Sequence, residues 1–94
     1  MYAALVEVDT TGQSDRDAAL SFLREQIVPM VSTAPGFVAG YWLAPREDGQ
    51  GSSIVVFETE ADITAAAQGM TVGSTVGPGT TIARFDIREV VASA

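Results

Sequence analysis

Two arginines and an aspartate alternate in the stretch IARFDIREVV, at residues 82–91. Apolar and polar residues alternate there, which predicts a β-strand with Arg84, Asp86 and Arg88 on one face. A guanidinium group suits planar anions, so Arg84 or Arg88 is a candidate to hold a carboxylate or an enolate in a cavity. The alternative is structural: a salt-bridge ladder across strands or subunits, or an exposed strand face that resists aggregation.

Glu7 is the only charged residue in the stretch YAALVEV, residues 2–8, which predicts the first strand. A buried arginine needs a carboxylate nearby, and Glu7 and Glu58 are the candidates from strand spacing. Glu7 is also a candidate general base in a dry cavity. In the alternative interpretation it lies in water near the strand end, or it pairs with an arginine.

Tyr41 and Trp42 are neighbours in the strand expected at residues 37–44, and Trp42 is the only tryptophan. Successive side chains of a strand point to opposite faces, so at most one of these rings reaches any one cavity. That ring is a candidate to stack on a flat ligand. In the structural alternative, one ring fills core beneath a helix and the other packs at a dimer interface.

The residue types that are absent limit the available chemistry. The chain contains no His, Cys, Lys or Asn. This excludes Ser-His-Asp and Cys-His catalysis, Schiff-base formation by lysine, and ligation of haem or metal through histidine. We therefore expect no cofactor and no metal site.

Charge and hydropathy give expectations about partners and location. The net charge is −7, which argues against binding to phosphate backbones and to anionic membrane surfaces. We therefore expect no nucleic-acid partner and no membrane partner. No apolar run reaches the ~18 residues of a membrane span, and no signal peptide is evident, so the expected location is cytoplasmic.

The elements that position these residues follow from periodicity, caps and turn residues. Ser14, with Asp17 three residues later, is expected to cap a first helix that kinks or breaks at residues 26–28 because of Pro29. Thr59, with Asp62 three residues later, is expected to cap a second helix. The expected strands cover residues 2–8, 37–44, 53–58 and 82–91, and a glycine-rich loop covers residues 71–81.

The order βαββαβ predicts an α+β, ferredoxin-like fold in one domain spanning residues 1–94. Its four-stranded antiparallel sheet would carry both helices on one face. The expected strands ALVEV and IVVF are apolar on both faces for most of their length. A bare apolar sheet face is an interaction surface, so we expect a homodimer through the sheet faces, forming a barrel.

Through several short motifs the chain resembles the dimeric α/β-barrel superfamily, in particular its antibiotic-biosynthesis-monooxygenase-like members. The motifs are IVP at residues 27–29, APGF at 34–37, GYW at 40–42, IVVFE at 54–58 and EAD at 60–62. The resemblance implies a homodimer with a small-molecule cavity between sheet and helices or within the barrel. Activities in this superfamily include cofactor-free oxidation of polyketide-like aromatics and haem degradation.

Matching residues to these activities narrows what the resemblance implies. Haem-degrading members use an axial histidine and an asparagine near the haem, and this chain has neither, so we do not expect haem degradation. Quinone-forming members place Asn, Trp and Tyr in the pocket, and Tyr41 and Trp42 supply two of these types.

Two functional hypotheses remain open. In the first, the homodimer binds a small hydrophobic or aromatic ligand and acts as a cofactor-independent, monooxygenase-like enzyme. The candidate ligand-binding residues are then Tyr41, Trp42, Arg84, Arg88 and Glu7. In the second, the chain is a non-catalytic interaction or ligand-sensing module whose barrel is filled by its own side chains. An enclosed pocket of a few hundred Å³ lined by an aromatic ring and an arginine would favour the first.

Overall fold

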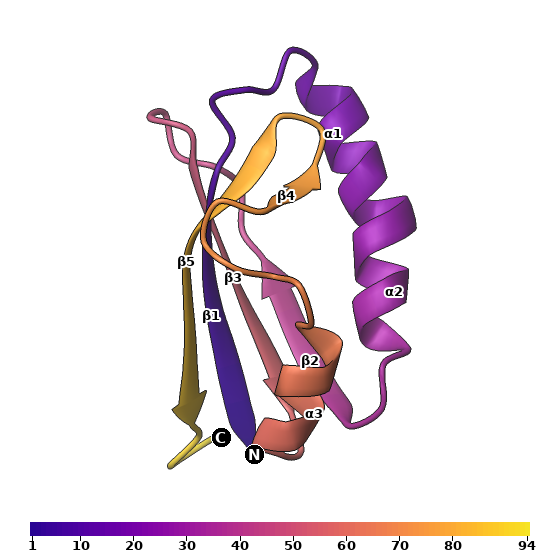
Figure 1. Cartoon of the computed structure of the whole chain (residues 1–94), viewed down its shortest axis with the longest axis vertical. Coiled ribbons are helices and arrows are strands. Elements are labelled where there is room, and N and C mark those ends of the chain that lie inside the picture. The colour runs from indigo at the N-terminus through magenta and orange to yellow at the C-terminus, as the bar shows by residue number, and fades with distance from the viewer.

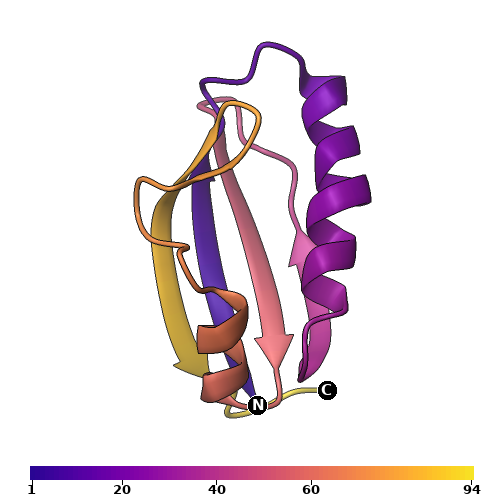
Figure 2. The same cartoon turned by 45° about the vertical axis from the view of Figure 1, so that its right-hand side comes forward.

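A curled, five-stranded antiparallel sheet forms one layer of the molecule, and the helices form a second layer on one of its faces (Figures 1 and 2). The computed structural model describes all residues 1–94. The elements are, in chain order, β1 (Tyr2–Asp9), α1 (Arg16–Phe22), the π-helical turn η1 (Leu23–Ile27), α2 (Val28–Ser32), β2 (Phe37–Trp42), β3 (Gln50–Phe57), α3 (Glu60–Ala66), β4 (Thr75–Gly77) and β5 (Thr80–Glu89). The strand order β2-β3-β1-β5-β4 makes the first strand central, and the arrangement is ferredoxin-like.

The expected count of four strands is wrong, because the stretch at residues 71–81 contains the short strand β4. Thr75 pairs with Thr81, and Gly77 pairs with Thr80, so β4 and β5 form a tight hairpin. Gly79 turns this hairpin with a φ of 61°. The glycines of this stretch suggested a loop, but Thr75 and Val76 are β-branched and fit a strand.

Strand ends also differ from expectation. The strand expected at 82–91 begins at Thr80 and ends at Glu89, so Val91 is exposed and does not pack against the helices. The strand expected at 53–58 begins at Gln50, because the pairing with β1 continues to Asp9. β2 ends at Trp42 rather than at residue 44.

One of the two expected helix caps is confirmed. The Thr59 side chain accepts a hydrogen bond from the backbone N–H of Asp62 at 3.1 Å and begins α3. The cap of α1 is Asp15 rather than Ser14, because the Asp15 carboxylate accepts from the N–H of Ala18 at 3.1 Å.

Pro29 disturbs the first helix, as its position predicts. Proline has no N–H to donate to the carbonyl four residues back, and its ring crowds that carbonyl. The turn before it widens into η1, in which the N–H of Val28 bonds to the carbonyl of Leu23. The irregularity therefore begins at Leu23, earlier than the expected residues 26–28, and the helix continues through α2.

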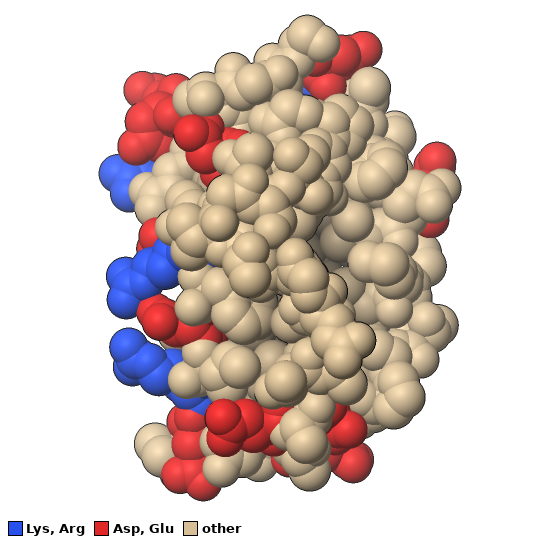
Figure 3. Space-filling model, viewed as in Figure 1, with Lys and Arg blue, Asp and Glu red and all other residues tan.

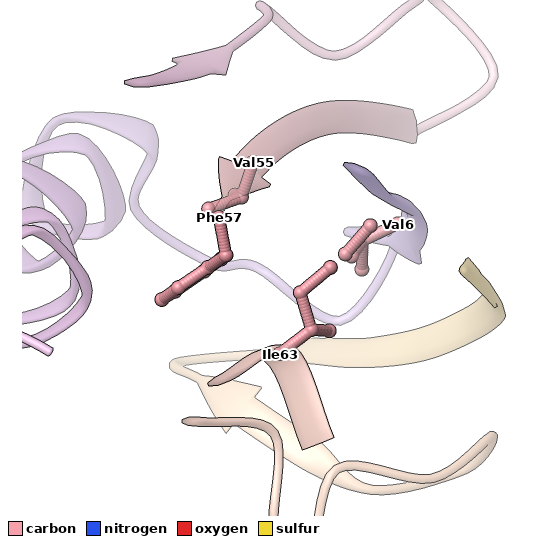
Figure 4. Packing of buried hydrophobic residues seen from close by; sticks show 5 residues of the cluster. Val6, Val55, Phe57 and Ile63 are labelled. Atoms are coloured by element: carbon pink, nitrogen blue, oxygen red, sulfur yellow. The ribbon is translucent and has the colours of Figure 1, made fainter. Parts of the chain in front are cut away.

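The core lies between the sheet and α3. Ile63 of α3 points toward the strands that carry Val6, Val55 and Phe57 (Figure 4). The rings of Phe37 and Phe57 meet edge to face, with centroids 5.8 Å apart. Only 8 of the 94 residues are buried, so the chain by itself leaves much apolar surface exposed.

No helix combines the length and the hydrophobicity that crossing a bilayer requires.

Candidate site on the open face of the sheet

The predicted charged row of β5 lies on the sheet face that no helix covers. Arg84 pairs with Glu7 of β1, Asp86 with Leu5, and Arg88 with Ala3. Paired residues share a face, and this face is opposite the one that carries the buried core residues. We call it the open face. Its residues include Ala3, Leu5, Glu7, Ala39, Tyr41, Ile54, Val56, Arg84, Asp86 and Arg88.

The open face is hollowed by a concavity of about 200 Å³. Its lining includes Leu5, Glu7, Leu43, Ile54, Arg84, Asp86 and Arg88. Two leucines and one isoleucine therefore form an apolar floor, and two carboxylates and two guanidinium groups surround it. Such a mixture can hold an apolar molecule and orient its polar end.

Arg84 and Asp86 form the only ion pair of the chain. The Arg84 Nε donates to Asp86 Oδ2 at 2.8 Å, within one strand. The expected carboxylate partners, Glu7 and Glu58, do not take this role. Glu7 lies directly opposite Arg84 yet forms no ion pair with it, and Glu58 does not line the concavity.

Arg88 lines the same concavity without a carboxylate partner. The other two residues of the charged row neutralise each other, so Arg88 is the guanidinium of this face with all its donors available. Figure 3 shows basic side chains gathered along the side of the molecule where β5 lies, with acidic side chains between them.

Tyr41 and Trp42 lie on opposite faces of β2, as expected. Tyr41 is exposed on the open face, where it does not line the concavity. Trp42 packs against the core on the helix-covered face, with its ring over Gly40. The two rings therefore do not form one aromatic site, and Trp42 is separated from the concavity by the sheet.

Phe37 does not share the face of Tyr41, contrary to the alternation of the sequence. The pairing of β2 with β3 shifts between Phe37 and Ala39, so Val38 is an extra residue. This bulge turns Phe37 toward the core, where it meets Phe57.

The apolar floor of the concavity was not singled out from the sequence. Leu43 alternates with Tyr41, and Ile54 belongs to the apolar run of β3, so both signals were present. Neither reveals that the two strands place these side chains beside Leu5, because that depends on strand order.

A second hollow, of about 310 Å³, lies between α2 and α3. Its lining consists of Met30, Val31, Ala34, Pro35, Asp62, Ala65 and Ala66. Asp62 is its only charged residue, so this hollow lacks the paired chemistry of the open face.

Asp9, at the end of β1, accepts two hydrogen bonds from Thr11. The Thr11 hydroxyl donates to Asp9 Oδ1 at 2.6 Å, and the Thr11 N–H donates to the same atom at 2.8 Å. These bonds favour the charged carboxylate and lower the pKa of Asp9. Asp9 does not line the concavity, so this shift concerns the turn after β1.

No protein-family model matches the chain, and no curated protein sequence matches it. Several solved structures resemble it over almost its full length, among them the following two. One is the second RRM domain of the yeast poly(U)-binding protein Pub1, with 15% identity, coverage of 99% of this chain and 100% of that one, and a TM-score of 0.51. The other is the heme-degrading protein Rv3592 from Mycobacterium tuberculosis, with 17% identity, coverage of 97% and 98%, and a TM-score of 0.51.

The comparison corrects the expectation that the chain has no nucleic-acid partner. That expectation came from the net charge alone, and the same ferredoxin-like fold occurs in an RNA-binding domain. The expected exclusion of a nucleic-acid partner is therefore withdrawn. At these identities the likenesses establish a small α+β protein with a ferredoxin-like fold.

Proposed function

We propose that the chain acts as a homodimer whose open faces stack into a barrel and enclose a small-molecule-binding site. The observation that carries this proposal is the exposure of large apolar side chains on the face that no helix covers. Tyr41 is 65% exposed, Leu43 57% and Ile54 39%. Apolar side chains clustered on one face mark an interaction surface.

The solvent-accessible surface area of the single chain supports the proposal that a partner covers part of it. A compact monomer of 9.8 kDa exposes roughly 5,200 Å², whereas this chain exposes 5993 Å². The excess of roughly 800 Å² is comparable to the area that one partner buries in a standard interface. A second copy of the open face is the simplest cover, because two sheets pack well face to face.

The charges of the open face suit a second copy of the same chain. Around the concavity, Glu7 and Asp86 balance Arg84 and Arg88, although the whole chain carries a net charge of −7. In a two-fold interface each patch meets itself, so a patch with both signs can complement its own copy. A patch of one sign would repel its copy.

The finer proposal is membership of the dimeric α/β-barrel superfamily, with a ligand that is small and hydrophobic or aromatic. The motifs at residues 34–37, 40–42 and 54–58 support it, and so does the ferredoxin-like topology. The cofactor-independent oxidation of an aromatic or polyketide-like compound is the enzymatic form of this proposal. The alternative is a non-catalytic module whose barrel is filled by its own side chains. Binding of a small molecule would favour the enzyme over this module.

Sedimentation equilibrium at micromolar concentration tests the assembly. We expect a mass twice the 9.8 kDa of the chain. A monomer throughout the micromolar range would overturn the proposal. Native mass spectrometry of freshly purified dimer then tests the binding role through a retained small molecule, and its absence in several preparations would favour the filled barrel.

A further inference from the structure

We infer that Arg88 makes the site on the open face selective for anions, so that its ligand is an apolar molecule carrying a single carboxylate. The inference rests on the proposed function, because stacking of two open faces is what encloses the concavity. It goes further by naming the chemical class of the ligand and the residue that selects it.

Only one of the two arginines at the concavity is available for a ligand charge. Arg84 is oriented and neutralised by Asp86, through the 2.8 Å bond from its Nε. Arg88, two residues beyond Asp86 on the same face, has no carboxylate within ion-pair distance. A guanidinium without a protein partner offers paired N–H donors in the geometry that a carboxylate accepts.

The position of Arg88 distinguishes it from the arginines elsewhere in the chain. Arg16 and Arg24 lie on the first helix, and Arg46 lies in the turn between β2 and β3. None of these three lines the concavity. Arg88 alone combines a free guanidinium with the apolar floor of Leu5, Leu43 and Ile54.

Glu7 limits the ligand to one carboxylate. Along β1, Arg88 pairs with Ala3, and Glu7 lies four residues further. Four residues of a strand span roughly 13 Å, so the free guanidinium and the free carboxylate lie toward opposite ends of the concavity. A molecule with a second carboxylate at its far end would bring that group toward Glu7, where like charges repel.

Three probes with the same ring system and different charge test the inference. They are 2-naphthoate, its neutral amide 2-naphthamide, and naphthalene-2,6-dicarboxylate. We expect the dimer to bind 2-naphthoate about tenfold or more tighter than the amide, because a charged hydrogen-bonded pair is lost in the amide. We expect the dicarboxylate to bind more weakly than 2-naphthoate. Isothermal titration calorimetry measures all three.

Variants assign the selectivity to one arginine. In Arg88→Gln we expect 2-naphthoate to bind no better than the amide, and in Arg88→Lys we expect part of the preference to remain. Arg24→Gln removes the same charge from the first helix and should leave the preference unchanged. A dimer that binds neither naphthoate nor amide, or binds both equally, overturns the inference, and so does a preference that survives Arg88→Gln.

Sedimentation of each protein separates this inference from the proposed function. A wild-type monomer defeats the proposed function, whereas a dimer without carboxylate preference defeats the inference alone. If Arg88 instead pairs with the partner subunit, Arg88→Gln weakens the dimer without changing the ratio of the two affinities, and that result also overturns the inference. Far-ultraviolet circular dichroism verifies that each variant is folded.

Discussion

Tyr41 and Ile54 lie directly opposite each other on β2 and β3, and both side chains are exposed on the open face. A cross-strand pair of an aromatic and a β-branched residue stabilises a sheet through mutual contact. Here the outer surfaces of both side chains remain in water in the single chain. The open face of a second copy is the partner that we propose to cover this pair.

Ile54→Glu should weaken the dimer strongly and leave the subunit folded. In the two-fold assembly each copy buries a new carboxylate and adds a negative charge to a face whose charges are otherwise balanced, so the two copies repel each other. We expect the dissociation constant to rise by about a hundredfold or more, as for removal of an interface hot spot. Sedimentation equilibrium measures it.

The matched control is Val72→Glu, which adds the same charge at an exposed side chain in the segment between α3 and β4. It should leave the dissociation constant unchanged. Equal dissociation constants for the two variants would contradict the open face as the interface.

The charged row of β5 shows how far the sequence alone reaches. Alternation of period two placed Arg84, Asp86 and Arg88 on one face, and the pairing with β1 puts them on the open face. Alternation does not reveal which of them pair, because that depends on side-chain rotamers. Arg84 and Asp86, two residues apart on one strand, satisfy each other, and this leaves Glu7 free.

Two other features depend on contacts between distant parts of the chain. The bulge at Val38 is invisible in the alternation, yet it decides that Phe37 joins the core. β4 is only 3 residues long and lies among glycines, so its local propensity is weak. Its hairpin is supported by the backbone of the segment after β1, which no local pattern predicts.

Gly40→Ala should displace the Trp42 ring. A Cβ at residue 40 would lie 2.8 Å from Trp42 Cη2 and 2.9 Å from Cζ3, so the indole must move. We expect tryptophan emission to shift to longer wavelength and the free energy of unfolding to fall by about 1 kcal/mol, as in a mild overpacking. Because Trp42 is the only tryptophan, the emission reports this site alone.

Tyr41→Phe provides the comparison, since it alters the neighbouring residue on the opposite face and should leave the emission of Trp42 where it is. An unshifted emission in Gly40→Ala would show that the indole does not lie over residue 40.

The Asp9–Thr11 turn predicts a specific dependence on pH. Hydrogen bonds from the Thr11 hydroxyl and N–H lower the pKa of Asp9 in the folded chain. The turn therefore stabilises the fold fully at pH values above the pKa that Asp9 has in the unfolded chain. This contribution is lost as the pH falls through the pKa that Asp9 has in the folded chain. Thr11→Val should raise the pKa of Asp9 toward its ordinary value. Carboxyl carbon chemical shifts, followed by NMR across acid pH, measure this.

Thr11→Val should therefore be less stable than the wild type near neutral pH, and the difference should shrink in acid below the folded pKa. Thr64→Val removes a hydroxyl that bonds to the carbonyl of Glu60 rather than to an acid, so its effect should not vary with pH. An unchanged titration of Asp9 in Thr11→Val would assign the shift to another cause.

Gly79→Ala should destabilise the chain more than any exposed loop substitution. Gly79 has a φ of 61°, a left-handed backbone conformation that is unfavourable for any residue with a side chain. In addition, a Cβ at this position would overlap the backbone of Gly12 and Gln13. Backbone atoms cannot rotate away, so the hairpin must separate from the segment after β1. It would then lose the bond from Gln13 Nε2 to Thr80 Oγ1 at 2.9 Å. We expect the free energy of unfolding to fall by about 3 kcal/mol or more.

Gly73→Ala separates the steric part of this loss from the conformational part. Gly73 also has a positive φ, 91°, but a Cβ added there would have no other atom within 4 Å. We expect its free energy of unfolding to fall by only about 1 kcal/mol, the cost of the left-handed backbone for an L-residue. Urea unfolding measures both variants. Equal losses would mean that the contact between the hairpin and Gly12 contributes nothing to the fold.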